Sequence, residues 1–489
     1  MSGSLLIYGE NVTKQSYLAA RLLNIRGQES TGISRGGDPV KDDKPIKTYK
    51  GHGLVTDVLS PDLVSNLSSP HHYAAIAHVK SSAVNKDESN IEPIEIRDDD
   101  YMIALAMDGK ILEDPKEYGV DSETELLGKI YFESLKETGD PKQAARTVMQ
   151  KLNRGYFSVV MLVSDNTETK AIAFRDKRGV RPLVRGSHNG THFVASESFV
   201  FSHPVNAVLE GDIPPGGYYE VSKAGMINEQ LVPREDKFCW FEYGYSSSRA
   251  SVHNGVLVHW VRERVGRELF KKHRDQFRGK RLIIGPNPES GRGVTEGFIN
   301  EAIKQQGELG MEVLYREYIL KNPYAKRTYI IPNKKERELE GSLKFLTIAD
   351  LVRDVLDSDA ELIEGDDSIV RGTVQRKVVD NFAANLYIDY HKERDLDELK
   401  REIRKKTHVV LGSPPLIKTC YDYLHEGKSS FIASNYAGLS ADDISDAVAK
   451  ELGLASVLYP SVETIVKATE LPADGFCLDC FTGKSIFDS

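Results

Sequence analysis

The first 236 residues alternate short apolar runs with polar breaks, which is typical of strands with a few helices among them. Three runs are β-branched or alternate in polarity and have turn residues near their ends: "FSVVMLVSD" (157–165), "KAIAFRD" (170–176) and "THFVASES" (191–198). Two runs carry apolar residues at helical spacing and stop at a glycine: "KQSYLAARLLNIRG" (14–27) and "DPKQAARTVMQKLNRG" (140–155). We therefore expect a mixed α+β domain here.

From about residue 237 the pattern changes to strand, loop and helix in turn. Residues 258–273 predict a helix, residues 279–293 a short buried strand leading into a glycine-containing loop, and residues 360–382 a strand, a loop and a helix. This repetition is typical of a mostly parallel α/β sheet, whose loops gather at the carboxyl ends of the strands. The charged run 395–406 predicts a helix with a solvated face.

Length and composition describe a globular protein with more than one domain. The chain has 489 residues, 40% hydrophobic and 28% charged, which is too long for one ordinary core. Its net charge of -9 argues against a general nucleic-acid binder. No stretch approaches the roughly 18 to 20 apolar residues that cross a bilayer, and the first residues show no basic lead before a long apolar segment. We expect no membrane insertion and a cytoplasmic location.

The string "GDDSIVRGT" (365–373) carries the clearest chemistry. Ser368, Gly372 and Thr373 lie where a predicted strand leads into a helix, so amides and hydroxyls can surround a phosphate at the positive helix end. Asp366 and Asp367 cannot hold phosphate, because like charges repel, but they can accept hydrogen bonds from sugar hydroxyls or bind Mg²⁺. The whole string predicts a sugar phosphate as ligand, whereas "DDS" alone would be an ordinary acidic loop.

Four cysteines are too few for a disulfide framework. Cys477 and Cys480 form a C-x-x-C pair, which can grip one metal ion or one face of a cluster, and Cys239 and Cys420 lie far from it in the chain. On spacing alone, structural cysteines, a zinc site and an iron–sulfur cluster all stay open.

The "GDDSIVRGT" string resembles the phosphoribosyl pyrophosphate signature of type I phosphoribosyltransferases, and its "SIVRGT" part resembles the amidophosphoribosyltransferase family. Other strings resemble that family too: the pyrophosphate loop "PESGRG" (288–293), the flexible loop "LKNPYAKRTYIIP" (320–332), the junction "FEYGYSSSRASVHNG" (241–255), and "IRGQESTGIS" (25–34), "RDKRGVRPL" (175–183) and "ASES" (195–198) of the glutaminase domain. The resemblance covers nearly the whole chain. It implies an N-terminal-nucleophile hydrolase-like αββα sandwich over 1–236, followed by a type I phosphoribosyltransferase α/β domain over 237–489.

The resemblance also implies residue roles in the transferase half. Phosphoribosyl pyrophosphate would contact Asp366, Asp367, Ser368, Arg371, Gly372, Thr373, Glu289, Ser290, Gly291 and Tyr324. Mg²⁺ would lie at Asp366 and Asp367, and Lys321 and Arg327 would stabilise the departing pyrophosphate. Departures from the family pattern are Pro323 and Lys326 in the flexible loop, Val374 after the signature, and Glu364 and Gly365 before it.

The cysteines match the family members that carry an iron–sulfur cluster. Those members have one cysteine at the start of the transferase domain, one after an "SPP" segment and a C-x-x-C near the end. The resemblance therefore assigns a 4Fe-4S cluster to Cys239, Cys420, Cys477 and Cys480, with a structural role. Zinc or an empty site is the alternative.

Departures from the family gather in the glutaminase half. Ser2 stands where the family has its nucleophilic cysteine, and Lys80 replaces an arginine that grips the glutamine carboxylate. Asp108, before Gly109, replaces an asparagine of the oxyanion hole, where a carboxylate would repel the developing charge. Glu123 replaces an aspartate that holds the substrate amine. The remaining residue assigned to this glutamine site is Arg26. We expect an inactive glutaminase.

Two functional hypotheses follow from the resemblance. The first is an enzyme of purine biosynthesis that binds phosphoribosyl pyrophosphate and forms 5-phosphoribosylamine with free ammonia, or less readily with another nitrogen nucleophile. The second is a catalytically inactive protein that binds nucleotide or phosphoribosyl pyrophosphate and regulates, or assembles with, an active paralogue. The resemblance also implies purine nucleotide inhibitors and a homo-oligomer, either a dimer or a tetramer.

Overall fold

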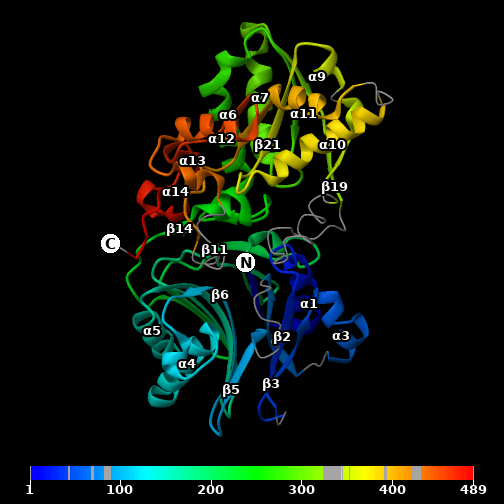
Figure 1. Cartoon of the computed structure of the whole chain (residues 1–489). Helices are drawn as coiled ribbons and strands as arrows, with labels where there is room; N and C mark the ends of the chain where they lie inside the picture. Colours follow the sequence, from blue (N-terminus) through cyan, green and yellow to red (C-terminus); the bar gives the residue numbers. More distant parts are fainter. Residues whose placement is uncertain are drawn as a thin grey trace. The chain divides into compact units, whose positions relative to one another are not determined.

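The computed structural model describes residues 2–41, 44–67, 71–81, 90–322, 343, 345–351, 353–389, 394–420 and 431–487. The chain divides into two compact units (Figure 1). The first unit comprises Met1–Cys239, Ser246–Leu257 and Asp474–Cys477, and the second comprises Trp240–Tyr245, Val258–Ala473 and Leu478–Ser489.

Two antiparallel sheets form the first unit. The seven-stranded sheet has the order β11-β9-β10-β1-β4-β2-β3 and consists of β1 (Ser2–Tyr8), β2 (Ser30–Gly37), β3 (Ile46–His52), β4 (His72–Lys80), β9 (Val184–His188), β10 (Thr191–Ala195) and β11 (Val208–Asp212). The six-stranded sheet has the order β13-β12-β8-β7-β6-β5 and consists of β5 (Ile94–Arg97), β6 (Met102–Ile111), β7 (Gly155–Ser164), β8 (Thr169–Arg175), β12 (Gly217–Ser222) and β13 (Gly225–Gln230).

Helices cover the outer faces of the two sheets. The side of the seven-stranded sheet that carries Leu5 and Ile7 packs against α1 (Val12–Leu23), and α2 (Val55–Val58) and α3 (Pro61–Leu67) lie beside that helix. The six-stranded sheet packs against α4 (Glu123–Thr138) and α5 (Pro141–Lys151). Ser122 caps α4 in a reciprocal box with Glu125, and Asp140 caps α5 ahead of Pro141, so both helices begin where their sequences signal a start.

Strand β7 shows why the unit has four layers. Val159, Met161 and Val163 belong to the apolar cluster shared with α4 and α5, whereas Val160 and Leu162 belong to the cluster shared with the seven-stranded sheet. Because side chains alternate along a strand, this strand is apolar on both faces and must be covered on both. The expected αββα sandwich is confirmed.

A five-stranded parallel sheet forms the centre of the second unit. Its order is β18-β17-β21-β22-β23, with β17 (Arg281–Pro286), β18 (Glu312–Tyr315), β21 (Ala360–Asp366), β22 (Thr407–Leu411) and β23 (Ser456–Leu458). The helices around it are α6 (Val258–His273), α7 (Arg292–Leu309), α9 (Arg353–Asp357), α10 (Thr373–Asp389), α11 (Leu396–Lys405), α12 (Ala441–Leu452), α13 (Val462–Thr469) and α14 (Asp479–Thr482). Figure 1 shows this alternation of strands and helices, and the expected α/β architecture is confirmed.

Three two-stranded ladders complete the strands of the described residues: β14 (Phe238–Cys239) with β24 (Phe476–Cys477), β15 (Val252–His253) with β16 (Val256–Leu257), and β19 (Ile319–Lys321) with β20 (Phe345–Thr347). The helix expected in the charged run is α11, whose buried residues are Leu399 and Ile403. No helix in the described part of the chain is long and apolar enough to span a membrane.

Candidate functional site

The parallel sheet has a change of direction between β17 and β21. From β17 the chain moves to β18 on one side, and it later returns to place β21 on the other side. In open α/β sheets, ligands bind at the carboxyl ends of the strands where the order reverses in this way. The loop after β17 leads into α7, and the loop after β21 leads into α10, so two helix N-termini and their loops meet at this point.

The two loops are packed directly against each other. The amide of Asn287 donates to the carbonyl of Gly365 at 2.7 Å. A Cβ on Gly291 would lie 2.0 Å from the Gly365 carbonyl oxygen, and a Cβ on Gly365 would lie 1.9 Å from the Thr295 hydroxyl oxygen. Neither position has room for a side chain, so glycine is what allows the loop after β17 to lie against the end of β21.

Asp366 ends β21 and Asp367 follows it; both are almost enclosed, with 4% of Asp366 and 7% of Asp367 exposed. The Oδ2 atom of Asp366 accepts from the side-chain amides of Asn287 and Gln375, both at 2.9 Å. Its Oδ1 atom accepts from the backbone amide of Asp367 at 2.8 Å. Burial, reinforced by Asp367 and Glu364, raises the pKa of Asp366 well above its usual range.

Glu364 is a second unusual carboxyl on β21. It is 1% exposed, and its Oε1 atom is buried with no hydrogen-bond partner in the described ranges. Burial raises the pKa of Glu364 from 4.5 to about 8. At neutral pH this side chain is therefore mostly a neutral acid, two residues before the signature aspartate on the same face of the strand.

The other transferase residues expected from the sequence surround these loops. Ser368 donates its hydroxyl to Asp367 Oδ2 at 3.0 Å, and Gly372 has a φ of +68°, next to the start of α10 at Thr373. Arg371 is half-buried between them in the chain. Glu289 is exposed and lies 3.5 Å from the guanidinium of Arg292.

Some of the remaining predicted residues lie within the described part of the chain and others lie outside it. Ser290 and Gly291 complete the loop before α7, and the exposed Lys321 is the last residue of β19. Tyr324 and Arg327 lie outside the described residues. The sequence analysis missed Asn287 and Gln375. The available signal was a polar residue just before the 288–293 motif and another shortly after the 365–373 motif.

The predicted glutamine site of the first unit contains a buried network of charges. Ser2 donates its hydroxyl to Asp108 Oδ1 at 2.7 Å. Arg26 is fully buried, donates to the Ser2 carbonyl at 2.6 Å, and forms ion pairs with Asp108 at 3.2 Å and Glu197 at 2.9 Å. Arg181 Nε lies 3.8 Å from Asp108 Oδ1, the oxygen that also accepts from Ser2. The two acids are thus compensated by arginines of the same unit.

Lys80 is engaged in the same manner. Its ammonium group lies 3.0 Å from Glu92, a fully buried carboxylate that also accepts from the Thr124 hydroxyl at 2.9 Å and the Met107 amide at 2.6 Å. Burial opposes ionisation, but Lys80, His78 and the Met107 amide together lower the pKa of Glu92 from 4.5 to about 2. The cation expected to hold a glutamine carboxylate is already neutralised.

Glu123 is also paired within the chain, and Gly109 has no room for a side chain. Glu123 pairs with Lys110 and accepts from the amide of Ile111 at 2.9 Å. Gly109 has a φ of +153°, and a Cβ there would lie 2.1 Å from the Tyr156 carbonyl oxygen. The structure brings Ser2, Arg26 and Asp108 into one hydrogen-bonded network, and it gives Lys80 and Glu123 separate partners.

Cys239 and Cys477 belong to the first unit, and Cys420 and Cys480 belong to the second. Cys239 stands opposite Cys477 in the parallel β14–β24 ladder. In the second unit the Cys480 carbonyl accepts from the amides of Ile417 and Lys418, just before Cys420 in the chain. Across the described ranges, no group of three or more histidine, cysteine, aspartate or glutamate side chains is arranged to hold a metal ion.

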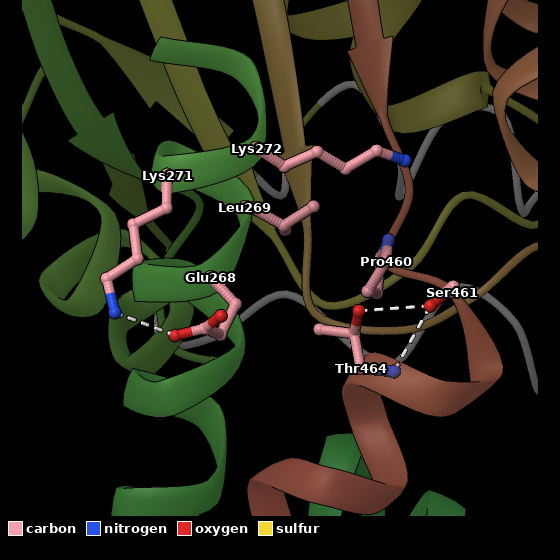
Figure 2. A pocket seen from close by; sticks show the side chains of 7 residues that line it. All are labelled: Glu268, Leu269, Lys271, Lys272, Pro460, Ser461 and Thr464. Carbon is pink, nitrogen blue, oxygen red and sulfur yellow. Dashed lines mark hydrogen bonds and ion pairs between the residues drawn. The ribbon is translucent and has the colours of Figure 1, made fainter.

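A pocket with a volume of about 310 Å³ lies in the second unit, and its lining side chains are drawn in Figure 2. It is lined by α6 and by the start of α13, through Glu268, Leu269, Lys271, Lys272, Pro460, Ser461 and Thr464. Lys271 pairs with Glu268 and Ser461 caps α13, so these groups are already satisfied within the chain. No residue of the loop between β17 and α7, or of the loop between β21 and α10, lines this pocket.

Comparison with proteins of known sequence finds relatives along nearly the whole chain. An amidophosphoribosyltransferase of Methanocaldococcus jannaschii is 29% identical over 502 aligned residues, covering 97% of this chain and 94% of that protein. An amidophosphoribosyltransferase of Pyrococcus horikoshii is 28% identical, covering 98% and 94%. The chloroplastic amidophosphoribosyltransferase 2 of Arabidopsis thaliana is 29% identical, covering 98% and 78%. No protein-family model matches the chain.

Solved structures give the same result. The glutamine phosphoribosylpyrophosphate amidotransferase of B. subtilis, complexed with ADP and GMP, superposes with a TM-score of 0.76 and 26% identity, covering 99% of this chain and 97% of that one. A structure described as the allosteric regulatory enzyme of purine biosynthesis superposes with a TM-score of 0.75 and 25% identity, covering 99% and 96%.

Proposed function

This chain is homologous to the amidophosphoribosyltransferases over nearly its whole length, and we propose that it is a phosphoribosyltransferase of that kind, acting in purine biosynthesis. It binds phosphoribosyl pyrophosphate and forms 5-phosphoribosylamine with ammonia. The observation that carries this proposal is the meeting of two anion-binding loops and two adjacent aspartates at the reversal between β17 and β21.

Each part of the site suits one part of the substrate. The loop from Ser368 to Thr373 holds the 5-phosphate with amides and hydroxyls at the start of α10. The loop from Glu289 to Gly291 holds the pyrophosphate at the start of α7. Asp366 and Asp367 accept hydrogen bonds from the sugar hydroxyls.

The reaction is a displacement at the anomeric carbon. The ammonia nitrogen forms a bond to this carbon, the bond from carbon to the pyrophosphate oxygen breaks, and pyrophosphate leaves with both electrons of that bond. The new ammonium group then loses a proton. The helix N-terminus at α7, with Lys321 and Arg327, stabilises the charge that develops on pyrophosphate.

Mg²⁺ fits the donor set of this site. Carboxylate oxygens are the ligands that Mg²⁺ prefers, and Asp366 and Asp367 supply them beside the space for substrate hydroxyls. When bound, the ion would neutralise phosphate charge. The aspartates themselves orient the sugar.

The glutaminase half is inactive in this proposal. A glutaminase needs free donors aimed at the developing oxyanion and a free cation for the substrate carboxylate. Here Asp108 occupies the expected donor position and is paired with Arg26, while Lys80 is paired with Glu92. The network supplies no neutral donor at Asp108, and the serine hydroxyl is directed to a carboxylate.

A second candidate is a protein that binds the sugar phosphate without turning it over and regulates an active paralogue. The near-complete burial of both aspartates and the raised pKa of the buried Glu364 carboxyl favour it, because they reduce the charge available to a metal–substrate complex. The experiment below separates the two candidates.

The cysteines, nucleotides and assembly belong to the same proposal. Cys239, Cys420, Cys477 and Cys480 supply the four thiols that a 4Fe-4S cluster takes, and the cluster would act structurally. Iron and inorganic sulfide should both fall in Cys477→Ser purified without oxygen. Purine nucleotides are proposed inhibitors, and a homo-oligomer is the proposed assembly.

The test is pyrophosphate release from phosphoribosyl pyrophosphate and Mg²⁺ by protein purified without oxygen. Saturating ammonium at high pH is compared with saturating glutamine. We expect turnover with ammonium alone, abolished in the double variant Asp366→Asn with Asp367→Asn. Glutamine turnover would overturn the inactive glutaminase. Binding of the sugar phosphate with no turnover by either donor would reject the enzyme in favour of the second candidate.

A further inference from the structure

Two side-chain amides from separate segments of the second unit donate hydrogen bonds to Asp366. Asn287 precedes the loop that leads into α7, and Gln375 lies in the first turn of α10. Both donate to the same oxygen, Oδ2, at 2.9 Å. All three side chains are at least nine-tenths buried. The contacts therefore lie in an enclosed space, where hydrogen bonds to a carboxylate are strong.

The count of lone pairs decides what Asp366 can offer a ligand. A carboxylate has about four acceptor positions, two on each oxygen. The two amides take both positions on Oδ2, so a ligand hydroxyl must approach Oδ1, which also accepts from the Asp367 amide. The two amides therefore fix the direction of the ligand contact.

The Asp366 carboxylate determines the orientation of the Asn287 side-chain amide. The Asn287 Oδ1 atom is buried and has no hydrogen-bond partner in the described residues. Rotating the amide by half a turn would bring that oxygen against the Asp366 carboxylate. The structure keeps the amide donor on the carboxylate although an acceptor is left unsatisfied, and such an acceptor normally destabilises a fold.

We propose that Asn287 and Gln375 are positioning residues for the sugar phosphate: they clamp Asp366 between the loop before α7 and the first turn of α10, so that its Oδ1 atom is directed at the ligand. This inference rests on the proposed function, because it assigns the geometry of that same site. Asn287 and Gln375 act through Asp366 and are not themselves catalytic.

The variants Asn287→Leu and Gln375→Leu remove each donor while keeping the approximate volume. The matched control is Gln305→Leu, since Gln305 also donates its amide to a carboxylate in the second unit, that of Glu301 at 2.7 Å on α7. Binding of ribose 5-phosphate and of Mg²⁺ phosphoribosyl pyrophosphate is measured by calorimetry on the full chain, with the melting temperature recorded for each variant. We expect binding of both ligands to weaken about tenfold in the two site variants and to stay unchanged in the control.

Inorganic phosphate separates positioning from simple support of the fold. It has no sugar hydroxyl, so its binding should not depend on the orientation of Asp366. We expect inorganic phosphate to bind equally well to the unmodified chain and to both leucine variants, whereas ribose 5-phosphate binds more weakly to the variants. A structural role would weaken the binding of both ligands.

The outcomes distinguish the two levels of the proposal. If the unmodified chain binds the sugar phosphate and both leucine variants bind it equally well, the clamp is overturned and the proposed function stands. If the leucine variants bind both ribose 5-phosphate and inorganic phosphate weakly, the clamp is also overturned. If the unmodified chain binds neither ligand, the proposed function fails and the clamp fails with it.

Discussion

The Ser2 hydroxyl donates a 2.7 Å hydrogen bond to Asp108, a carboxylate that Arg26 also holds. The residue at the expected nucleophile position is therefore bonded to the residue at the expected oxyanion position. Two groups that a glutaminase would aim at its substrate are aimed at each other.

Arg26→Met should destabilise the first unit by about 4 kcal/mol. The variant leaves Asp108 and Glu197 buried with less positive charge, and an uncompensated buried charge is costly. Chemical denaturation measures the difference. The control Arg234→Met breaks an exposed pair with Asp236 in the same unit and should change stability by less than about 1 kcal/mol. Equal effects of the two variants would contradict the assignment.

Glu92 should govern the acid side of the stability profile. Its pKa is about 2 in the folded chain against an ordinary 4.5, so its stabilisation is present above pH 4.5 and is lost as the pH falls toward 2. The loss attributable to this group is about 3 kcal/mol. Glu92→Gln should flatten that part of the curve in denaturation at several pH values. Glu235→Gln, which removes an exposed partner of Lys177, should leave it unchanged.

Glu364 should act in the opposite direction. Its pKa of about 8 in the folded chain means that the folded state keeps a proton which the unfolded chain releases above pH 4.5. Stability therefore falls as the pH rises from 4.5 to 8, by about 5 kcal/mol in total, and then levels off. Glu364→Leu should remove this decline and be more stable than the unmodified chain at pH 8. A variant that declines as steeply would show that another group is responsible.

Gly291→Ala should disrupt the sugar phosphate site. The added Cβ would lie 2.0 Å from the Gly365 carbonyl oxygen, so the loop before α7 must move away from the end of β21. Overpacking of this kind costs about 1 to 3 kcal/mol. We therefore expect the affinity for phosphoribosyl pyrophosphate to fall about tenfold or more. Titration calorimetry provides the measurement.

Gly307→Ala is the matched control on α7. A Cβ at Gly307 meets open space, and alanine is the better helix former by about 1 kcal/mol. This variant should bind the ligand normally and melt at a slightly higher temperature. Weakened binding in both variants would mean that α7 as a whole, and not the loop contact, is sensitive.

The sequence predicted the layers better than the contacts. The alternation in residues 157–165 and the helical spacing in residues 258–273 reflect local burial, and β7 and α6 appear where these patterns indicated. The strand, loop and helix around the signature are likewise local and are β21 and α10. These features depend on neighbours in the chain.

The contacts that decide the chemistry are not local. Asn287 reaches Asp366 because the parallel register places Pro286 beside Gly365, a pairing that spacing along the chain cannot show. Glu92 was not anticipated as the partner of Lys80, because their meeting depends on how β4 and the approach to β5 are brought together. The charged residues of the glutamine site were identified from the sequence, but their mutual neutralisation required the structure.

The buried ion pairs also constrain how this protein could change over generations. Replacing Asp108 by asparagine removes a negative charge that helps compensate Arg26 and Arg181, and replacing Ser2 by cysteine leaves that carboxylate in place. The first change unbalances buried charge and the second does not relieve it, so an exchange at these positions is tolerated only when the residues around Asp108 change together.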